Sequence, residues 1–165
     1  MGDYKMWVGV LMIHTSHFLR HFAFLQTSRT RRVRKSTLMS ISGGEYHSIF
    51  IDCNKCVWGC GDNEYYQVGL NEGGVIEKPQ PLSDLPLIIY GSAGGFHTLL
   101  IAEDGTVWGF GNGQRGRLGK KISTRQKQQI PTPTPVQAVS AGVSHSLFLD
   151  VDGHVWSCGL NECGQ

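Results

Sequence analysis

Residues 94–111 read Gly-Gly-Phe-His-Thr-Leu-Leu-Ile-Ala-Glu-Asp-Gly-Thr-Val-Trp-Gly-Phe-Gly, and the chain contains this stretch in three related copies. The residues that recur are a glycine, a histidine, a tryptophan and a closing glycine: Gly44, His47, Trp58 and Gly61; Gly94, His97, Trp108 and Gly111; Gly142, His145, Trp156 and Gly159. Both the histidines and the tryptophans are spaced by 50 and then 48 residues. A period near 50 is typical of a repeat array, in which each unit buries its apolar face against its neighbours.

Each copy predicts a β-hairpin. The histidine is followed by an unbroken apolar run, at 49–51, 99–101 and 147–149, which favours a strand covered on both faces. Two copies continue with Asp104-Gly105 and Asp152-Gly153, a pair that predicts a tight type I′ turn. In the returning strand, small residues alternate with large ones, which lets a neighbouring sheet approach closely on one face.

The connectors between the hairpins add further strands. Residues 70–91 and 120–139 carry prolines at alternate positions, which suits an extended edge strand because proline cannot donate to a central ladder. Residues 87–90 and 136–139 are mostly apolar and predict a strand that leads into the next Gly-x-x-His. Three to four short strands in every 50 residues indicate an all-β chain built of propeller blades.

The repeat resembles that of the regulator of chromosome condensation family. Its motifs are Gly-x-x-His-Ser/Thr, the Asp-Gly turn, Val-Trp-x-x-Gly and an Asn-Glu-x-Gly-Gln element, which here spans 63–69, 113–119 and 161–165. Tyr66 stands where this element has glycine, and Gly113 stands where it has asparagine. The resemblance covers residues 41–165 and implies a seven-bladed β-propeller with four-stranded antiparallel blades.

The expected organisation is a partial β-propeller of about three blades behind a non-propeller leader. The leader spans residues 1–40, the blades span 41–165, and the copies cover 41–90, 91–138 and a truncated 139–165. We expect the chain to be a fragment, or a segment that associates with further blades.

Charge divides the chain at the same place. Residues 1–40 carry seven Lys/Arg against one acid, and residues 41–165 carry eight against twelve. The basic cluster of the leader is Arg29, Arg31, Arg32, Arg34 and Lys35. It fits a solvated leader, a transit peptide, a membrane-surface helix, or a nuclear-import or nucleic-acid patch. Histidines and an arginine interrupt the apolar stretch before it, so no transmembrane span is expected.

No catalytic, cofactor or metal site is predicted. A His-Ser/Thr pair present in three copies favours a histidine that makes structural hydrogen bonds to backbone groups between blades, since a catalytic group is needed only once. The Cys53-x-x-Cys56 pair occurs in a single copy, and exposed redox exchange there is a weaker alternative. Cys60 and Cys158 share a repeat position with Phe110, which favours a buried apolar role and an intracellular, cytoplasmic or nuclear setting.

One charged stretch is the candidate surface for a partner. It comprises Arg115, Arg117, Lys120 and Lys121 and continues to Arg125 and Lys127. Propellers bind through loops at their ends, so this stretch predicts a contact with acidic protein or with phosphates.

The sequence therefore favours a non-enzymatic protein-interaction scaffold. Two alternatives remain open. The first, implied by the resemblance, is guanine nucleotide exchange on a small GTPase. The second is chromatin or nucleic-acid tethering through the cluster from Arg29 to Lys35.

Overall fold

The computed structural model describes residues 38–119 and 124–165, and these form strands with one short 3-10 turn, η1 (Gln114–Gly116). The strands are β1 (Leu38–Gly43), β2 (His47–Asp52), β3 (Val57–Asp62), β4 (Val75–Pro81), β5 (Ile88–Ala93), β6 (His97–Ala102), β7 (Val107–Gly111), β8 (Thr124–Ile130), β9 (Val136–Ala141), β10 (His145–Asp150) and β11 (Val155–Gly159). The all-β prediction for the repeats is confirmed.

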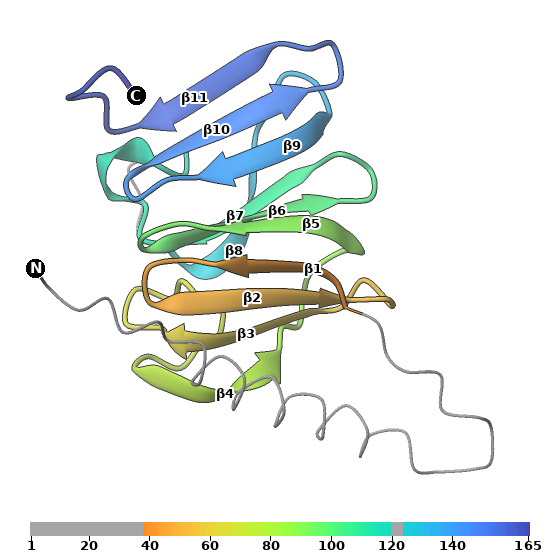
Figure 1. Cartoon of the computed structure of the whole chain (residues 1–165), viewed down its shortest axis with the longest axis vertical. Helices are drawn as coiled ribbons and strands as arrows, with labels where there is room; N and C mark the ends of the chain where they lie inside the picture. The colour runs from red at the N-terminus through yellow and green to blue at the C-terminus, as the bar shows by residue number, and fades with distance from the viewer. Residues whose placement is uncertain (1–37, 120–123) are drawn as a thin grey trace, which may run out of the picture. The chain divides into compact units, whose positions relative to one another are not determined.

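The strands form three antiparallel sheets, each of which is one propeller blade (Figure 1). The first blade has the order β1-β2-β3-β4, the second β5-β6-β7-β8, and the third β9-β10-β11. The hairpin register is the same in all three, because each repeat histidine pairs with its closing glycine: His47 with Gly61, His97 with Gly111, and His145 with Gly159. The sequence repeat therefore specifies one pairing pattern three times.

The outer strand β4 behaves as its prolines predict. Among the described strands it pairs with β3 alone, and it contains Pro79 and Pro81, which cannot donate to a second neighbour. The following strands β5 and β9 begin each new blade at Ile88 and Val136, within the apolar segments predicted from the sequence.

The hairpin turns differ from the predicted type I′ geometry. In the second blade the residues from Glu103 to Thr106 connect β6 to β7, and the Gly105 N–H donates to the Ala102 carbonyl at 2.9 Å. Gly105 alone has a positive φ, +81°, in this loop. A type I′ turn needs two residues of positive φ, so the loop is a tight turn closed by one left-handed residue. Lys55 takes that position in the first blade with φ +64°.

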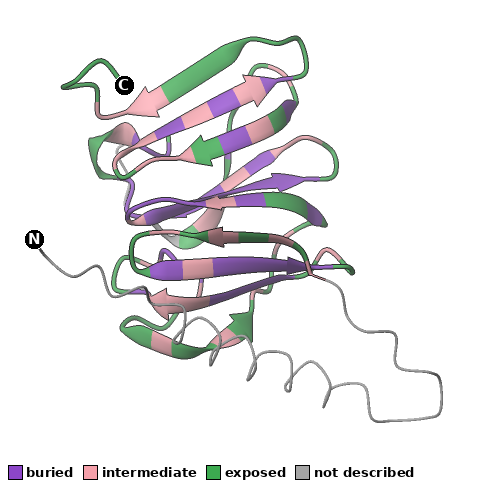
Figure 2. Ribbon diagram, in the orientation of Figure 1, coloured by how far each residue is buried: buried purple, intermediate pink, exposed green. Residues whose placement is uncertain are grey.

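Two apolar clusters lie between the blades. Ile49 and Ile51 of β2 are 1% exposed and pack with residues of the second blade. Leu99 and Ile101 of β6 are 0% exposed and pack with residues of the third blade, including Val139. Figure 2 shows the middle strands buried and much of β4 and β11 exposed. The blades are therefore held together by facing β-sheets.

The predictions for the leader lie outside the described residues, except for its last residues, which open β1 at Leu38. The basic cluster from Arg29 to Lys35 is among those outside. Among the residues described, no helix has the length and apolarity needed to cross a membrane.

Candidate functional site

The repeat histidines link neighbouring blades through a hydroxyl group. His47 Nε2 lies 2.8 Å from Thr98 Oγ1 of the second blade, and Thr98 donates to the Gln67 carbonyl at 2.7 Å. The same relay joins the next two blades, where His97 Nε2 lies 2.8 Å from Ser146 Oγ. The Ser146 hydroxyl donates to the Arg117 carbonyl at 2.7 Å. The imidazoles thus reach backbone carbonyls indirectly, where the sequence predicted direct bonds to backbone groups.

This relay fixes the protonation of each buried ring. The single Thr98 proton goes to a carbonyl, so His47 Nε2 must carry the hydrogen that it shares with the hydroxyl oxygen. The Nδ1 atoms of His47 and His97 are then unprotonated and have no partner among the described residues. Burial lowers the pKa of His47 to about 4, against a smaller opposing effect of the Asp62 carboxylate. Burial, followed by the charge of Arg117, lowers the pKa of His97 to about 3.

The glycine three residues before each histidine allows the backbones of two neighbouring blades to approach each other closely. A Cβ on Gly44 would lie 2.3 Å from the Gly94 carbonyl oxygen and 2.7 Å from Cε1 of His47. A Cβ on Gly94 would likewise lie 2.4 Å from the Gly142 oxygen. The backbones are close enough for the Glu45 N–H to donate to the Gly94 carbonyl at 3.2 Å. The Gly-x-x-His spacing is therefore a requirement of blade contact.

A second polar element lies at the opposite end of the hairpin and was missed in the sequence. The indole Nε1 of Trp58 donates to Asp52 Oδ2 at 3.2 Å, and that of Trp156 donates to Asp150 Oδ2 at 2.9 Å. Each aspartate precedes its tryptophan by six residues, and this spacing was the available signal. The second blade has Ala102 at that position.

Trp108 of the second blade consequently lacks this bond. Its Nε1 is buried and has no acceptor within residues 38–119 and 124–165. In the third blade, hydrogen bonds from Trp156, the His154 backbone and Thr134 lower the pKa of the Asp150 carboxyl well below its usual range. The tryptophan hairpins therefore share a register without sharing every polar partner.

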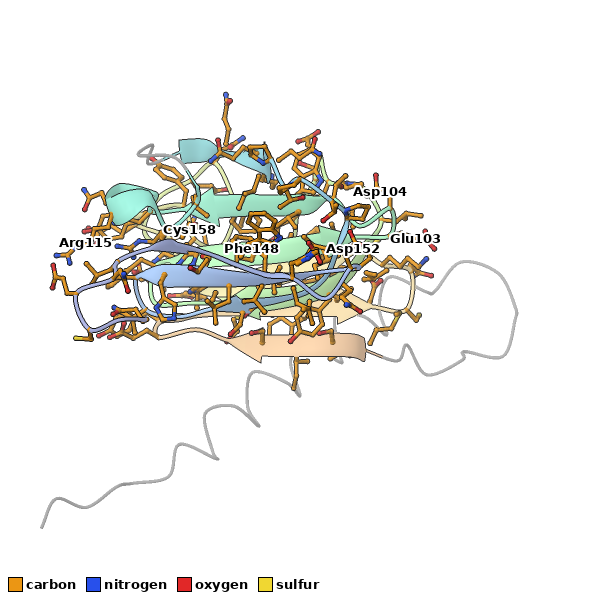
Figure 3. The ribbon with its side chains drawn as sticks, turned by 90° about the horizontal axis from the view of Figure 1, so that it is seen from above. Glu103, Asp104, Arg115, Phe148, Asp152 and Cys158 are labelled. Atoms are coloured by element: carbon orange, nitrogen blue, oxygen red, sulfur yellow. The ribbon has the colours of Figure 1, made fainter. Side chains whose placement is uncertain are left out.

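The predicted basic surface is only partly present at the surface. Arg117 is 4% exposed, and its guanidinium donates to the carbonyls of Gln114 and Val143 at 3.0 Å each, which ties the second blade to the third. Arg115 is exposed and lies 3.5 Å from Glu162. Figure 3 shows Arg115 at one end of the strands and Glu103, Asp104 and Asp152 toward the other.

Lys120 and Lys121 lie outside the described residues. Of the four predicted contact residues, Arg115 is therefore the one placed on the surface, whereas Arg117 has a structural position in the interior.

The Cys53-x-x-Cys56 pair lies in the exposed turn between β2 and β3. Burial raises the pKa of the Cys56 thiol, and the charges of Asp52 and Cys53 raise it further. A reactive thiol requires the opposite shift. Burial also raises the pKa of Cys60 and Cys158, both half-buried on strands, in keeping with an apolar role.

One group of side chains has the composition of a metal site. Asp150, Asp152 and His154 offer ligand atoms within 4.8 Å of one another in the β10–β11 turn. The Asp150 oxygens already accept bonds from the backbone N–H groups of Asp152 and His154 as well as from Trp156. This carboxylate is therefore used to shape the turn.

The end of the blades that carries Arg115 also carries an exposed aromatic cluster. The rings of Tyr46 and Phe96 have centroids 6.1 Å apart, and those of Tyr65 and Phe96 are 5.6 Å apart in an edge-to-face arrangement. Tyr46 is 57% exposed and Tyr65 is 40% exposed. The sequence signal was the aromatic residue directly before the histidine in two of the three copies.

The fold is that of a β-propeller repeat protein, because two four-stranded sheets and one three-stranded sheet stack with the same hairpin register and with interblade contacts. A family model described as the regulator of chromosome condensation (RCC1) repeat matches residues 40–67, 88–117 and 136–165, and a second model with this description matches 55–101 and 104–149. The chain belongs to the RCC1 repeat family, as its motifs predicted.

Curated relatives share the repeats over most of this chain. The chain is 35% identical over 148 residues to the probable E3 ubiquitin-protein ligase HERC6 of Homo sapiens. This match covers 86% of the chain and 14% of HERC6. It is 30% identical over 142 residues to Protein RCC2 of Homo sapiens, covering 81% of this chain and 26% of the relative. The chain thus spans about a quarter or less of the length of these relatives.

Solved structures share the fold. Human WBSCR16 superposes with a TM-score of 0.71 at 20% identity, over 79% of this chain and 35% of that protein. Yeast RCC1 (Prp20), in its complex with Kap60, superposes with a TM-score of 0.68 at 22% identity, over 82% of this chain and 32% of Prp20.

Proposed function

We propose that this chain is a non-enzymatic interaction module whose blade loops bind a partner protein. The aromatic cluster carries the proposal: the exposed Tyr46 and Tyr65 contact the partly buried Phe96, and large apolar side chains gathered in loops on a protein surface mark interaction sites. The polar side chains of the repeat support the same function. The histidine relays and the Trp–Asp pairs are used for blade contacts and turns, so they are not available as catalytic groups.

Arg115 extends this surface toward the third blade. It follows β7, at the end of the sheet where the β5–β6 turn places Phe96. The Asn112 N–H donates to the Phe96 carbonyl at 2.8 Å, which holds the two loops together. The proposed surface therefore keeps Arg115 from the sequence prediction and omits the buried Arg117.

The test is crosslinking followed by mass spectrometry on three forms of the tagged whole chain. The first is the natural sequence, the second is Tyr46→Leu/Tyr65→Leu, and the third is the control Tyr90→Leu. Tyr90 is 44% exposed on β5 and lies outside the cluster. A partner recovered with the natural chain and the control, but lost with the double variant, supports the proposal. A set of crosslinked proteins that is identical for all three forms contradicts it.

Guanine nucleotide exchange is the alternative with support from the relatives. Several of them are named regulator of chromosome condensation. Prp20p of Saccharomyces cerevisiae, which shares the fold, is described with its binding properties to Gsp1p and histones. The test is the release of a fluorescent guanine nucleotide from a panel of small GTPases. The interaction module predicts release rates unchanged by the chain, and an acceleration of tenfold or more would establish exchange instead.

Tethering to chromatin or nucleic acid through the cluster from Arg29 to Lys35 is a separate proposal. Deletion of residues 1–37 should abolish binding to a DNA duplex if the cluster is the tether, because phosphate contacts by Lys and Arg dominate such affinity. Binding that survives the deletion removes this tether. An intracellular location, cytoplasmic or nuclear, stays a prediction beside these functions.

A further inference from the structure

The aromatic cluster is built from loops of two different blades. Tyr46 lies in the β1–β2 turn, Tyr65 in the loop after β3, and Phe96 in the β5–β6 turn of the second blade. Backbone bonds hold these loops in place: the Asp62 N–H donates to the Tyr46 carbonyl at 2.8 Å, and the Glu45 N–H donates to Gly94 at 3.2 Å. The two tyrosine rings are thus exposed on a fixed scaffold and need no folding upon binding.

The hairpins do not require these rings, although Phe96 packs against Tyr46 and Tyr65 across the boundary between the first two blades. The third blade has Ser144 at the position of Tyr46 and Phe96, and its hairpin keeps the same register. The interblade hydrogen bonds in this part of the fold use the adjacent backbone and the histidine side chains. The hairpin register and the interblade hydrogen bonds therefore do not account for the exposure of Tyr46 and Tyr65, whose exposed fractions are 57% and 40%.

Carboxylates accompany both tyrosines. Glu45 directly precedes Tyr46 and raises the pKa of that tyrosine through a hydrogen bond and through its charge. Glu64 directly precedes Tyr65, and both glutamates are exposed. Residues 41–165 contain twelve Asp/Glu and eight Lys/Arg, which gives the repeats a formal charge of −4. The cluster therefore combines π faces with negative charge.

This combination suits a guanidinium group. Arginine stacks on aromatic rings and can at the same time donate hydrogen bonds to a carboxylate, whereas the ammonium group of lysine is a compact and more strongly hydrated charge. An anionic ligand would meet repulsion from Glu45 and Glu64.

We propose that Tyr46, Tyr65, Phe96 and Glu45 form a binding surface for an arginine-bearing extended segment of a partner protein. The inference rests on the interaction module proposed above, and it assigns the chemical class of that partner. Arg115, at the third-blade side of the surface, lies beside Glu162, whereas the exposed carboxylates next to the tyrosines are those of Glu45 and Glu64. The aromatic part of the surface is therefore negative, and the partner contributes the basic side chains.

The experiment is a fluorescence anisotropy titration of the whole chain against three labelled twelve-residue peptides. One alternates arginine with glycine, the second has lysine in place of arginine, and the third has glutamate. We expect the arginine peptide to bind at least threefold more tightly than the lysine peptide, and the glutamate peptide not to bind. The affinity for the arginine peptide should fall about tenfold in Tyr46→Leu/Tyr65→Leu and about threefold in Glu45→Gln. Tyr90→Leu should bind as the natural chain does.

Equal binding of the arginine peptide by the natural chain and the tyrosine double variant would overturn the proposal, as would equal affinity for all three peptides. Urea unfolding curves for each variant verify that a loss of binding is not a loss of fold. If the peptide is not bound but the crosslinked partner still depends on Tyr46 and Tyr65, the arginine class is wrong and the interaction module stands. If neither readout depends on these tyrosines, both proposals fail.

Discussion

Acidification should weaken the contact between blades, because two buried imidazoles must stay neutral in the folded chain. The pKa is lowered to about 4 for His47 and to about 3 for His97. In the unfolded chain both rings titrate near about 6.5. Between these values the unfolded chain binds more protons than the folded chain, so the free energy of unfolding falls as the pH falls below about 7.

The size of the effect follows from these pKa values. At about pH 5 the unfolded rings are almost fully protonated and the folded rings are mostly neutral, so each histidine costs about 2 kcal/mol relative to about pH 7.5. The pair then costs about 4 kcal/mol, a large part of the stability of a typical domain. The Asp150 carboxyl, with its pKa well below the usual range, stays ionised in this window and adds nothing to the change.

The assay is urea unfolding followed by tryptophan fluorescence at pH 7.5 and pH 5.0. The variant His47→Gln removes one titrating ring and should retain about half of the acid-induced loss. The control His154→Gln changes a side chain that is 69% exposed and should retain the whole loss. A free energy of unfolding that is equal at the two pH values, or a full loss in His47→Gln, would refute the role of these rings.

Three further substitutions test the blade contacts and the hairpin turns. Gly44→Ala should cost about 3 kcal/mol or more in urea unfolding because its Cβ would meet a carbonyl at 2.3 Å, whereas Gly73→Ala, with nothing within 4 Å, should change little. Asp150→Ala should lower the melting temperature by several degrees because Trp156 loses its acceptor, and an equal effect of Asp152→Ala would contradict this. Lys55→Gly should stabilise the chain by up to about 1 kcal/mol through relief of φ +64°, and a loss of stability would show that its bond to Glu103 outweighs that strain.

The strands and their register could be predicted because the signals are local and occur three times. The histidine, the apolar run, the turn and the tryptophan recur at one spacing, and neighbouring strands of a hairpin pair in the order in which they occur. The prediction of a type I′ turn was wrong because an Asp-Gly pair indicates only the position at which a positive φ is permitted. Whether one residue or two adopt it depends on loop length, and here Gly105 is the one.

The side-chain environments were harder to predict because their partners are distant in the sequence. Arg117 has the appearance of a solvated loop residue, but its acceptor on Val143 lies 26 residues away in the next blade. The rings of Tyr46 and Tyr65 meet Phe96 across 50 and 31 residues. Such contacts form only when the blades are stacked, so no local sequence pattern predicts them.

The relay from imidazole to hydroxyl to carbonyl gives the second blade two different sides. In the second blade His97 faces forward to Ser146, while Thr98, the next residue along β6, faces back to His47. A tandem duplication of one repeat supplies both the histidine and the hydroxyl group that the relay needs. An inverted repeat would instead place histidine against histidine and hydroxyl against hydroxyl. The side chains of the two residues between glycine and histidine are not members of this relay. The side chains at these two positions can therefore differ between repeats and contact different molecules, while the hydrogen-bond relay between the blades is retained.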